Sequence, residues 1–137
     1  VAKFGQLLNF RVIVSDDRTD LLTSQHIPGK VEFLPCLMSE IPQHLQINSQ
    51  VYIVGVTRGS EVDIEGLPAL LEFEPAYIGL IGSLKRWGTT KKALQDLGMS
   101  ADKIAKIKSP IGIDIEAETP DEIAISILAE VIEVLNS

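Results

Sequence analysis

The chain has 137 residues, of which 45% are hydrophobic and 23% are charged. This length suits one domain with a buried core, and the composition excludes an intrinsically disordered chain. The formal net charge of −7 opposes nonspecific binding to nucleic acid and to anionic membranes. No apolar run approaches the about 20 residues of a membrane span, and the single cysteine fits a reducing cytoplasm.

The first half of the chain alternates helical and extended patterns. Residues 1–8 keep apolar side chains at helical spacing without a start signal, so we expect a helix entered midway. β-branched runs at 11–15, 31–34 and 51–56 predict strands, and a weak helical pattern covers 39–45.

The second half continues this alternation. The apolar run at 77–82 predicts a fourth strand, and both this run and 51–56 are apolar on two faces, as in a sheet covered by helices. Helical patterns are present at 65–73, 89–98 and 100–107.

The last helix, from residue 120, has the clearest start signals. Thr119 can cap it, Pro120 suits the first helical position, and Glu122 completes a capping box. One apolar stripe follows at helical spacing, and we expect it to face the core: Ile123, Ile127, Leu128, Val131, Ile132 and Leu135.

Alternating strands and helices predict a parallel sheet with right-handed crossovers. We therefore expect one Rossmann-like α/β domain over residues 1–137, with three layers and a mostly parallel sheet. A strand followed by G-x-G-x-x-G should precede the first helix of such a fold, and the chain contains neither. The first strand and the glycine-rich loop are thus expected to be lacking.

Ligands of open α/β sheets bind beyond the carboxyl ends of the strands. Asp16 and Asp17 follow the strand at 11–15, where an acidic residue commonly accepts from ribose hydroxyls. Aspartate also ends strands and caps turns without any ligand, so both interpretations stay open.

Thr57 and Arg58 follow the third strand. The Arg58 guanidinium could clamp a carboxylate or a phosphate in a bidentate manner. Alternatively, Arg58 pairs with Glu61 or Asp63 on the surface, which we consider the more ordinary outcome.

The stretch "YIGLIGSLKR" ends the fourth strand with two glycines and two cations. We expect Gly82 and Ser83 to form a turn, with a helix beginning close behind, so that backbone N–H groups point into the crevice. Lys85 and Arg86 would then add positive charge to an anion site. The alternative is that both cations simply face water.

Other reactive residues form no recognisable site. His26 and His44 lack further ligands at metal-binding spacing. Cys36 has apolar neighbours and resembles a small buried residue more than a nucleophile.

Several phrases, in order, resemble the C-terminal domain of the XdhC/CoxI family: "FRVIVSDDR", "VTRGSEVD", "YIGLIGS" and "SPIGIDIEAETPDEIAISILAEVI". These proteins are accessory factors of xanthine dehydrogenase and related molybdenum hydroxylases. The resemblance implies a Rossmann-like domain that binds the molybdenum cofactor (molybdopterin), assists its sulfuration by a partner enzyme and helps insert it into the apo-hydroxylase. That is a chaperone role rather than turnover of a substrate.

Two other functions remain open from the residues alone. The carboxylates after the strand at 11–15 would suit an NAD(P)-binding oxidoreductase-like domain, although the glycine loop is lacking. An incomplete sheet has an edge that invites pairing, so an interaction module or a homodimer is also plausible.

Overall fold

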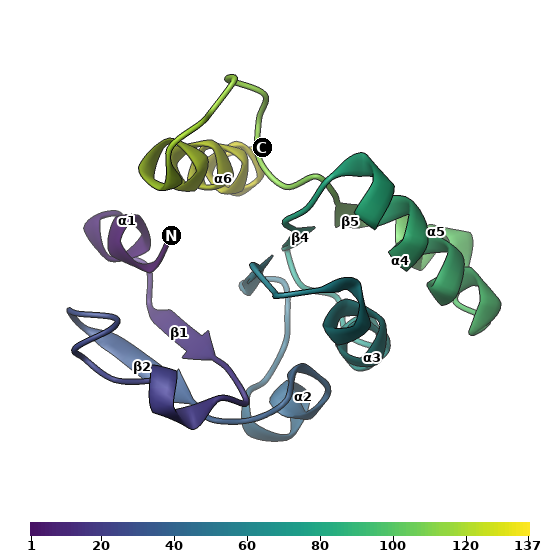
Figure 1. Ribbon diagram of the computed structural model, residues 1–137, viewed down its shortest axis with the longest axis horizontal. Helices are drawn as coiled ribbons and strands as arrows, with labels where there is room; N and C mark the ends of the chain where they lie inside the picture. The colour runs from purple at the N-terminus through teal and green to yellow at the C-terminus, as the bar shows by residue number, and fades with distance from the viewer.

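The computed structural model describes residues 1–137, and it has the three layers expected of a Rossmann-like α/β domain (Figure 1). Five short strands form its centre: β1 Val12–Ser15, β2 Val31–Leu34, β3 Tyr52–Gly55, β4 Tyr77–Leu80 and β5 Ile107–Lys108. Six α-helices surround them: α1 Ala2–Leu7, α2 Ile41–His44, α3 Ser60–Leu70, α4 Leu84–Asp96, α5 Ala101–Ala105 and α6 Pro120–Leu135. Two 3-10 turns, η1 Thr19–Leu21 and η2 Met38–Glu40, complete the chain.

Every strand pair is parallel, as predicted, but the strands form two separate sheets. One sheet has the order β1-β2 and the other the order β3-β4-β5. Val12 pairs with Val31 in the first sheet, and Tyr52 pairs with Tyr77 in the second. The outer strands β1, β2, β3 and β5 each have one edge without a strand partner.

The side chains of β4 divide between two apolar clusters. Ile78 and Leu80 pack with α3, α4, α5 and β5 in the larger cluster. Tyr77 packs with Leu128 and Val131 of α6, and Phe4 of α1 lies against that smaller cluster. α1 and α6 therefore cover one face of the β3-β4-β5 sheet, and α3, α4 and α5 cover the other (Figure 1).

Two predicted helices begin earlier than their apolar patterns suggested. α3 starts at Ser60 rather than residue 65. α4 starts at Leu84, before the helical pattern at 89–98 but directly behind the turn, where a helix was expected to follow. The start of α4 is fixed by Ser83, whose hydroxyl accepts a hydrogen bond from the Arg86 N–H at 3.1 Å. Both first turns mix charged or polar side chains with apolar ones, and the apolar patterns used for the prediction began only after them.

The predicted helix at 100–107 is only partly correct. α5 ends at Ala105, and Ile107 begins β5, where it pairs with Ile78 and is 6% exposed. A strand of two residues has no periodicity of its own, so the sequence could not reveal it.

The last helix begins and ends close to where its sequence predicts. The Thr119 hydroxyl accepts from the Glu122 N–H at 3.1 Å, which confirms the cap. The Glu122 carboxylate accepts from the Glu118 N–H at 3.2 Å, so the expected reciprocal bond to Thr119 falls one residue earlier. Neither α6 nor any other helix is long and apolar enough to cross a membrane.

Candidate functional site

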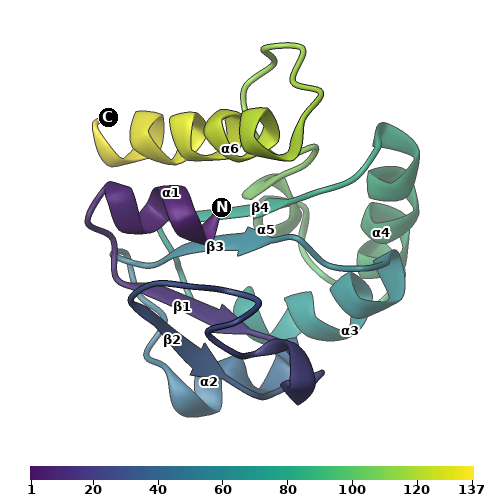
Figure 2. The ribbon, with the colours of Figure 1, turned by 60° about the vertical axis from the view of Figure 1, so that its left-hand side comes forward.

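Parallel strands place their carboxyl ends at one edge, and the predicted site residues lie in the segments that leave this edge. The arrowheads of β1, β2 and β3 point to the same side of the molecule (Figure 2). Asp16 and Asp17 follow β1, Thr57 and Arg58 follow β3, and the Gly82–Arg86 segment follows β4.

Asp17 and Arg58, predicted separately, lie together. The two Arg58 terminal nitrogens donate to the two Asp17 carboxylate oxygens at 3.2 and 3.3 Å. The side chains of Asp17 and Arg58 are 36% and 46% exposed respectively. The expected partners of Arg58, Glu61 and Asp63, were therefore wrong, because the fold brings a carboxylate from the other sheet to the guanidinium.

Asp16 instead pairs with the neighbouring Arg18. Its Oδ1 accepts from the Arg18 Nε–H at 3.0 Å and from the Arg18 backbone N–H at 2.9 Å, and its Oδ2 accepts from a terminal guanidinium nitrogen at 2.8 Å. These hydrogen bonds lower the pKa of Asp16 to about 2. Asp16 is therefore a fixed carboxylate at neutral pH.

Asp63, on the first turns of α3, is buried and joins the ends of β3 and β4. It is 1% exposed, and its Oδ2 accepts from Arg86 at 2.9 Å. The same Arg86 nitrogen donates to Thr57 Oγ1 at 2.6 Å, and the Thr57 hydroxyl donates to the other Asp63 oxygen. We call Thr57, Asp63 and Arg86 the internal clamp.

The internal clamp separates two cations that the sequence grouped together. Arg86 points inward, with a side chain 23% exposed, and its fork also contacts the Thr57 carbonyl at 3.4 Å. Lys85 is exposed at the start of α4 and forms no ion pair. Of these two residues, Lys85 is the one available to an external anion.

The turn between β4 and α4 has the expected form. Gly82 has a φ of 137°, which residues other than glycine rarely adopt. A Cβ there would lie 2.8 Å from Cδ of Arg86, so the glycine also makes room for the internal clamp. Ser83 uses its hydroxyl to cap α4.

Cys36 lies at the same edge, beside the end of β1. Its Sγ is 3.7 Å from Ser15 Oγ, and this hydroxyl also contacts the Cys36 carbonyl at 3.4 Å. Cys36 is 9% exposed, which agrees with the prediction of a small buried residue. Its place next to β1 depends on the pairing of β1 with β2, which apolar patterns alone do not fix.

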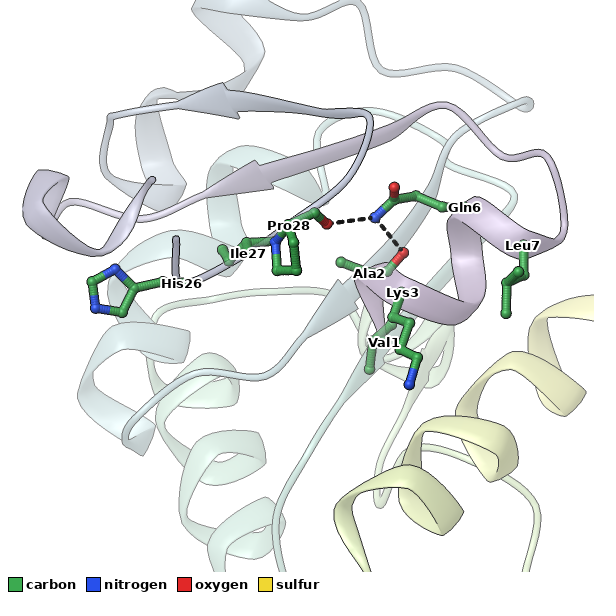
Figure 3. Close-up of a pocket in the computed structure, with 8 residues that line it drawn as sticks. All are labelled: Val1, Ala2, Lys3, Gln6, Leu7, His26, Ile27 and Pro28. Atoms are coloured by element: carbon green, nitrogen blue, oxygen red, sulfur yellow. Dashed lines mark hydrogen bonds between the residues drawn. The ribbon is translucent and has the colours of Figure 1, made fainter. Parts of the chain in front are cut away.

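An open pocket lies elsewhere on the surface. It has a volume of about 520 Å³ and is lined by α1 and by residues 26–28 (Figure 3). Gln6 already donates to the Pro28 carbonyl at 3.3 Å and accepts from the Lys30 N–H at 2.7 Å. None of the predicted site residues lines this pocket, so we place the candidate site at the carboxyl edge, where the chemistry-bearing side chains gather.

Comparison with known proteins identifies the family. The XdhC Rossmann domain matches residues 1–131. The chain belongs to the XdhC family.

Relatives of this family member carry three different names. The uncharacterized protein YqeB of Escherichia coli is 30% identical over 138 residues, which cover 100% of this chain and 25% of YqeB. The molybdenum cofactor insertion chaperone PaoD of E. coli is 29% identical over 65% of this chain and 28% of PaoD. A probable xanthine dehydrogenase subunit of Bacillus subtilis is 31% identical over 90% of this chain and 36% of that protein.

A solved structure confirms the Rossmann-like fold. The crystal structure of a xanthine dehydrogenase from Bacillus halodurans superposes with a TM-score of 0.82 at 29% identity, over 98% of this chain and 38% of that one. The chain thus spans between 25% and 38% of the length of each of these proteins.

Proposed function

We propose that this chain is the cofactor-handling domain of an accessory factor that binds molybdenum cofactor and helps insert it into a molybdenum hydroxylase. The observation that carries the proposal is the match of residues 1–131 to the XdhC Rossmann domain. The name of PaoD, a molybdenum cofactor insertion chaperone, supports it further. Such a factor delivers its cofactor and does not turn over a substrate.

The carboxyl edge has groups that fit the two ends of this cofactor. Molybdopterin has a terminal phosphate, for which Arg58, Lys85 and the N–H groups of the Gly82–Ser83 turn are suitable donors. Its pterin ring has N–H groups, for which the carboxylates of Asp16 and Asp17 are suitable acceptors. When bound, the cofactor supplies the molybdenum centre of the hydroxylase, and this chain holds and orients it.

Thr57 and Arg86 have a supporting place in this proposal. Both are engaged in the internal clamp, where Arg86 donates to Thr57 Oγ1 at 2.6 Å and to Asp63 at 2.9 Å. They would fix the turns after β3 and β4, from which Arg58 and Lys85 reach the ligand. We expect the partners of the chain to be the apo-hydroxylase and the enzyme that sulfurates the cofactor, in the cytoplasm.

The test uses the chain itself and cofactor released from a molybdoenzyme. Trp87 is half-buried one residue after Arg86, so its fluorescence should change on binding. We expect saturable quenching, weakened by Arg58→Gln, and faster reconstitution of apo-xanthine dehydrogenase in the presence of the chain. Cofactor that leaves both signals unchanged would refute the proposal.

NAD(P) is the second candidate ligand, because Asp16 and Asp17 follow a parallel strand where ribose hydroxyls are often accepted. The same fluorescence assay with NADH and NADPH distinguishes a nicotinamide ligand from molybdenum cofactor. Saturation by a nicotinamide cofactor, with none by molybdenum cofactor, would favour an oxidoreductase-like domain.

A further inference from the structure

Two arginine–aspartate pairs at the carboxyl edge differ sharply in exposure. Asp63 of the internal clamp is 1% exposed, and its bond to Arg86 is 2.9 Å long. Asp17 is 36% exposed, and its two bonds from Arg58 measure 3.2 and 3.3 Å. Charge-assisted hydrogen bonds usually measure about 2.7–2.9 Å, so the Asp17–Arg58 contact is a loose one.

This difference decides which arginine can exchange partners. Removing Arg86 from Asp63 would strand a buried carboxylate, which is strongly unfavourable. Removing Arg58 from Asp17 returns both groups to water, and exposed pairs contribute little. A ligand anion can therefore compete for Arg58 but not for Arg86.

The Asp17–Arg58 pair also differs from the internal clamp in its place in the fold. The Asp17–Arg58 pair is the only ion pair that joins the β1–β2 part of the chain to the part that contains β3, β4 and β5. It lies at the carboxyl ends of β1 and β3, which belong to different sheets. Breaking the Asp17–Arg58 pair would therefore remove the ion pair that connects these two parts at the carboxyl edge.

We propose that Asp17 is the resting counter-ion of Arg58 and that the phosphate of a phosphomonoester ligand displaces it. This inference rests on the proposed function for the position of the ligand. It adds that Asp17 and the ligand phosphate compete for Arg58. Asp17 then acts as an internal competitor that lowers phosphate affinity, and phosphate binding frees the carboxylate to accept from another part of the ligand. A protein that must release its cargo gains from such competition, because the carboxylate returns when the phosphate leaves.

The probe is inorganic phosphate, titrated at constant ionic strength and followed by NMR. The backbone amides of Gly59 and Ser60 report binding beside Arg58, and the carboxyl carbon of Asp17 reports its release. We expect both signals to move with one common midpoint. Phosphate that shifts the amides while the Asp17 signal stays still would overturn the exchange.

Variants separate this competition from a simple change in net charge. Asp17→Asn should lower the phosphate Kd by about two- to fivefold, the scale of an exposed ion pair. Glu61→Gln is the matched control, because Glu61 is exposed on the first turn of α3, has the same charge and does not pair with Arg58. Glu61→Gln should change the Kd by less than half as much. Equal changes of the phosphate Kd in the two variants would show that Asp17 acts only through its charge and does not compete for Arg58.

Substitutions of Arg58 itself complete the test. Arg58→Gln should abolish saturable phosphate shifts, and Arg58→Lys should restore weaker binding because a lysine keeps the charge without the fork. Unchanged binding in Arg58→Gln would also overturn the proposal. Circular dichroism of each variant checks folding. If phosphate displaces Asp17 from Arg58 but the chain does not bind molybdenum cofactor, this inference holds and the proposed function is refuted.

Discussion

Tyr77 of β4 donates a hydrogen bond of 2.6 Å to the carboxylate of Glu130 on α6, across 53 positions of the sequence. The same Glu130 oxygen accepts from the Gly112 N–H at 3.2 Å, in the loop between β5 and α6. One carboxylate therefore fastens a strand, a loop and a helix. Burial, followed by the bond to Glu130, raises the pKa of the Tyr77 hydroxyl, so it remains a donor throughout the ordinary pH range.

Tyr77→Phe removes the donor and leaves Glu130 with one partner fewer in a partly buried place. We expect the free energy of unfolding to fall by about 1–3 kcal/mol, the scale of a lost hydrogen bond to a charged group. Urea unfolding measures it, with Tyr52→Phe as the control, because the Tyr52 ring packs edge-on against Phe10 but its hydroxyl forms no hydrogen bond. Equal losses in both variants would contradict a special role for the Tyr77 hydroxyl.

Asp63→Ala should be the most damaging change at the carboxyl edge. It strands Arg86 in a place where its side chain is only 23% exposed, and breaking a buried pair costs about 3–5 kcal/mol. Asp17→Ala, which breaks the exposed pair, should cost about 0–1 kcal/mol. Chemical denaturation of both variants tests this ordering, and similar losses would show that the two pairs are energetically alike.

Asp16 makes stability depend on pH in the acidic range. Its pKa is lowered from an ordinary value of 3.8 to about 2, chiefly by the hydrogen bond from Arg18. A carboxyl whose folded pKa is depressed contributes stability above its unfolded pKa. We expect this contribution to be lost as the pH falls from about 4 to about 2.

Titration of the Asp16 carboxyl carbon by NMR measures this pKa directly. Arg18→Gln should move the midpoint back toward the ordinary value. Arg11→Gln should leave it unchanged, because Arg11 pairs with Glu32 at the opposite end of β1. An Asp16 midpoint near its ordinary value in the unaltered chain would show that the pair with Arg18 does not form in solution.

Two glycines of the same region should respond to alanine in opposite directions. Gly82→Ala forces a side chain into a φ of 137° and places its Cβ 2.8 Å from Arg86, so it should destabilise the chain by at least about 1 kcal/mol. Gly88 lies inside α4 with no atom within 4 Å of an added Cβ. Gly88→Ala should therefore stabilise by up to about 1 kcal/mol. If the two variants shift the melting temperature in the same direction, this prediction is wrong.

Local signals in the sequence were enough to predict much of the fold. The α6 cap at Thr119, the glycine turn at Gly82 and the four longer strands each depend on residues close together in the chain. The Rossmann-like class follows from their alternation. β5 escaped because a strand of two residues, Ile107 and Lys108, is defined by its partner rather than by its own pattern.

The site was harder to predict because its pairings are long-range. Asp17 and Arg58 were each singled out, but their contact spans 41 positions and crosses between two sheets. Asp63 looked like an exposed residue near Arg58, and only the packing of α3 against α4 shows that it is buried against Arg86. Charge and spacing predict which residues are reactive, but they do not predict which residues neutralise one another.

The separation of the strands into two sheets also has a consequence for how the molecule opens. Both apolar clusters draw their buried members from Leu67 onward, whereas every residue of β1 is only half-buried. Regions with few buried apolar contacts exchange their amide hydrogens through low-energy partial unfolding. The β1–β2 part should therefore unfold as a separate cooperative unit while β3, β4 and β5 stay protected. Native-state hydrogen exchange would then resolve two levels of protection within this one Rossmann-like domain.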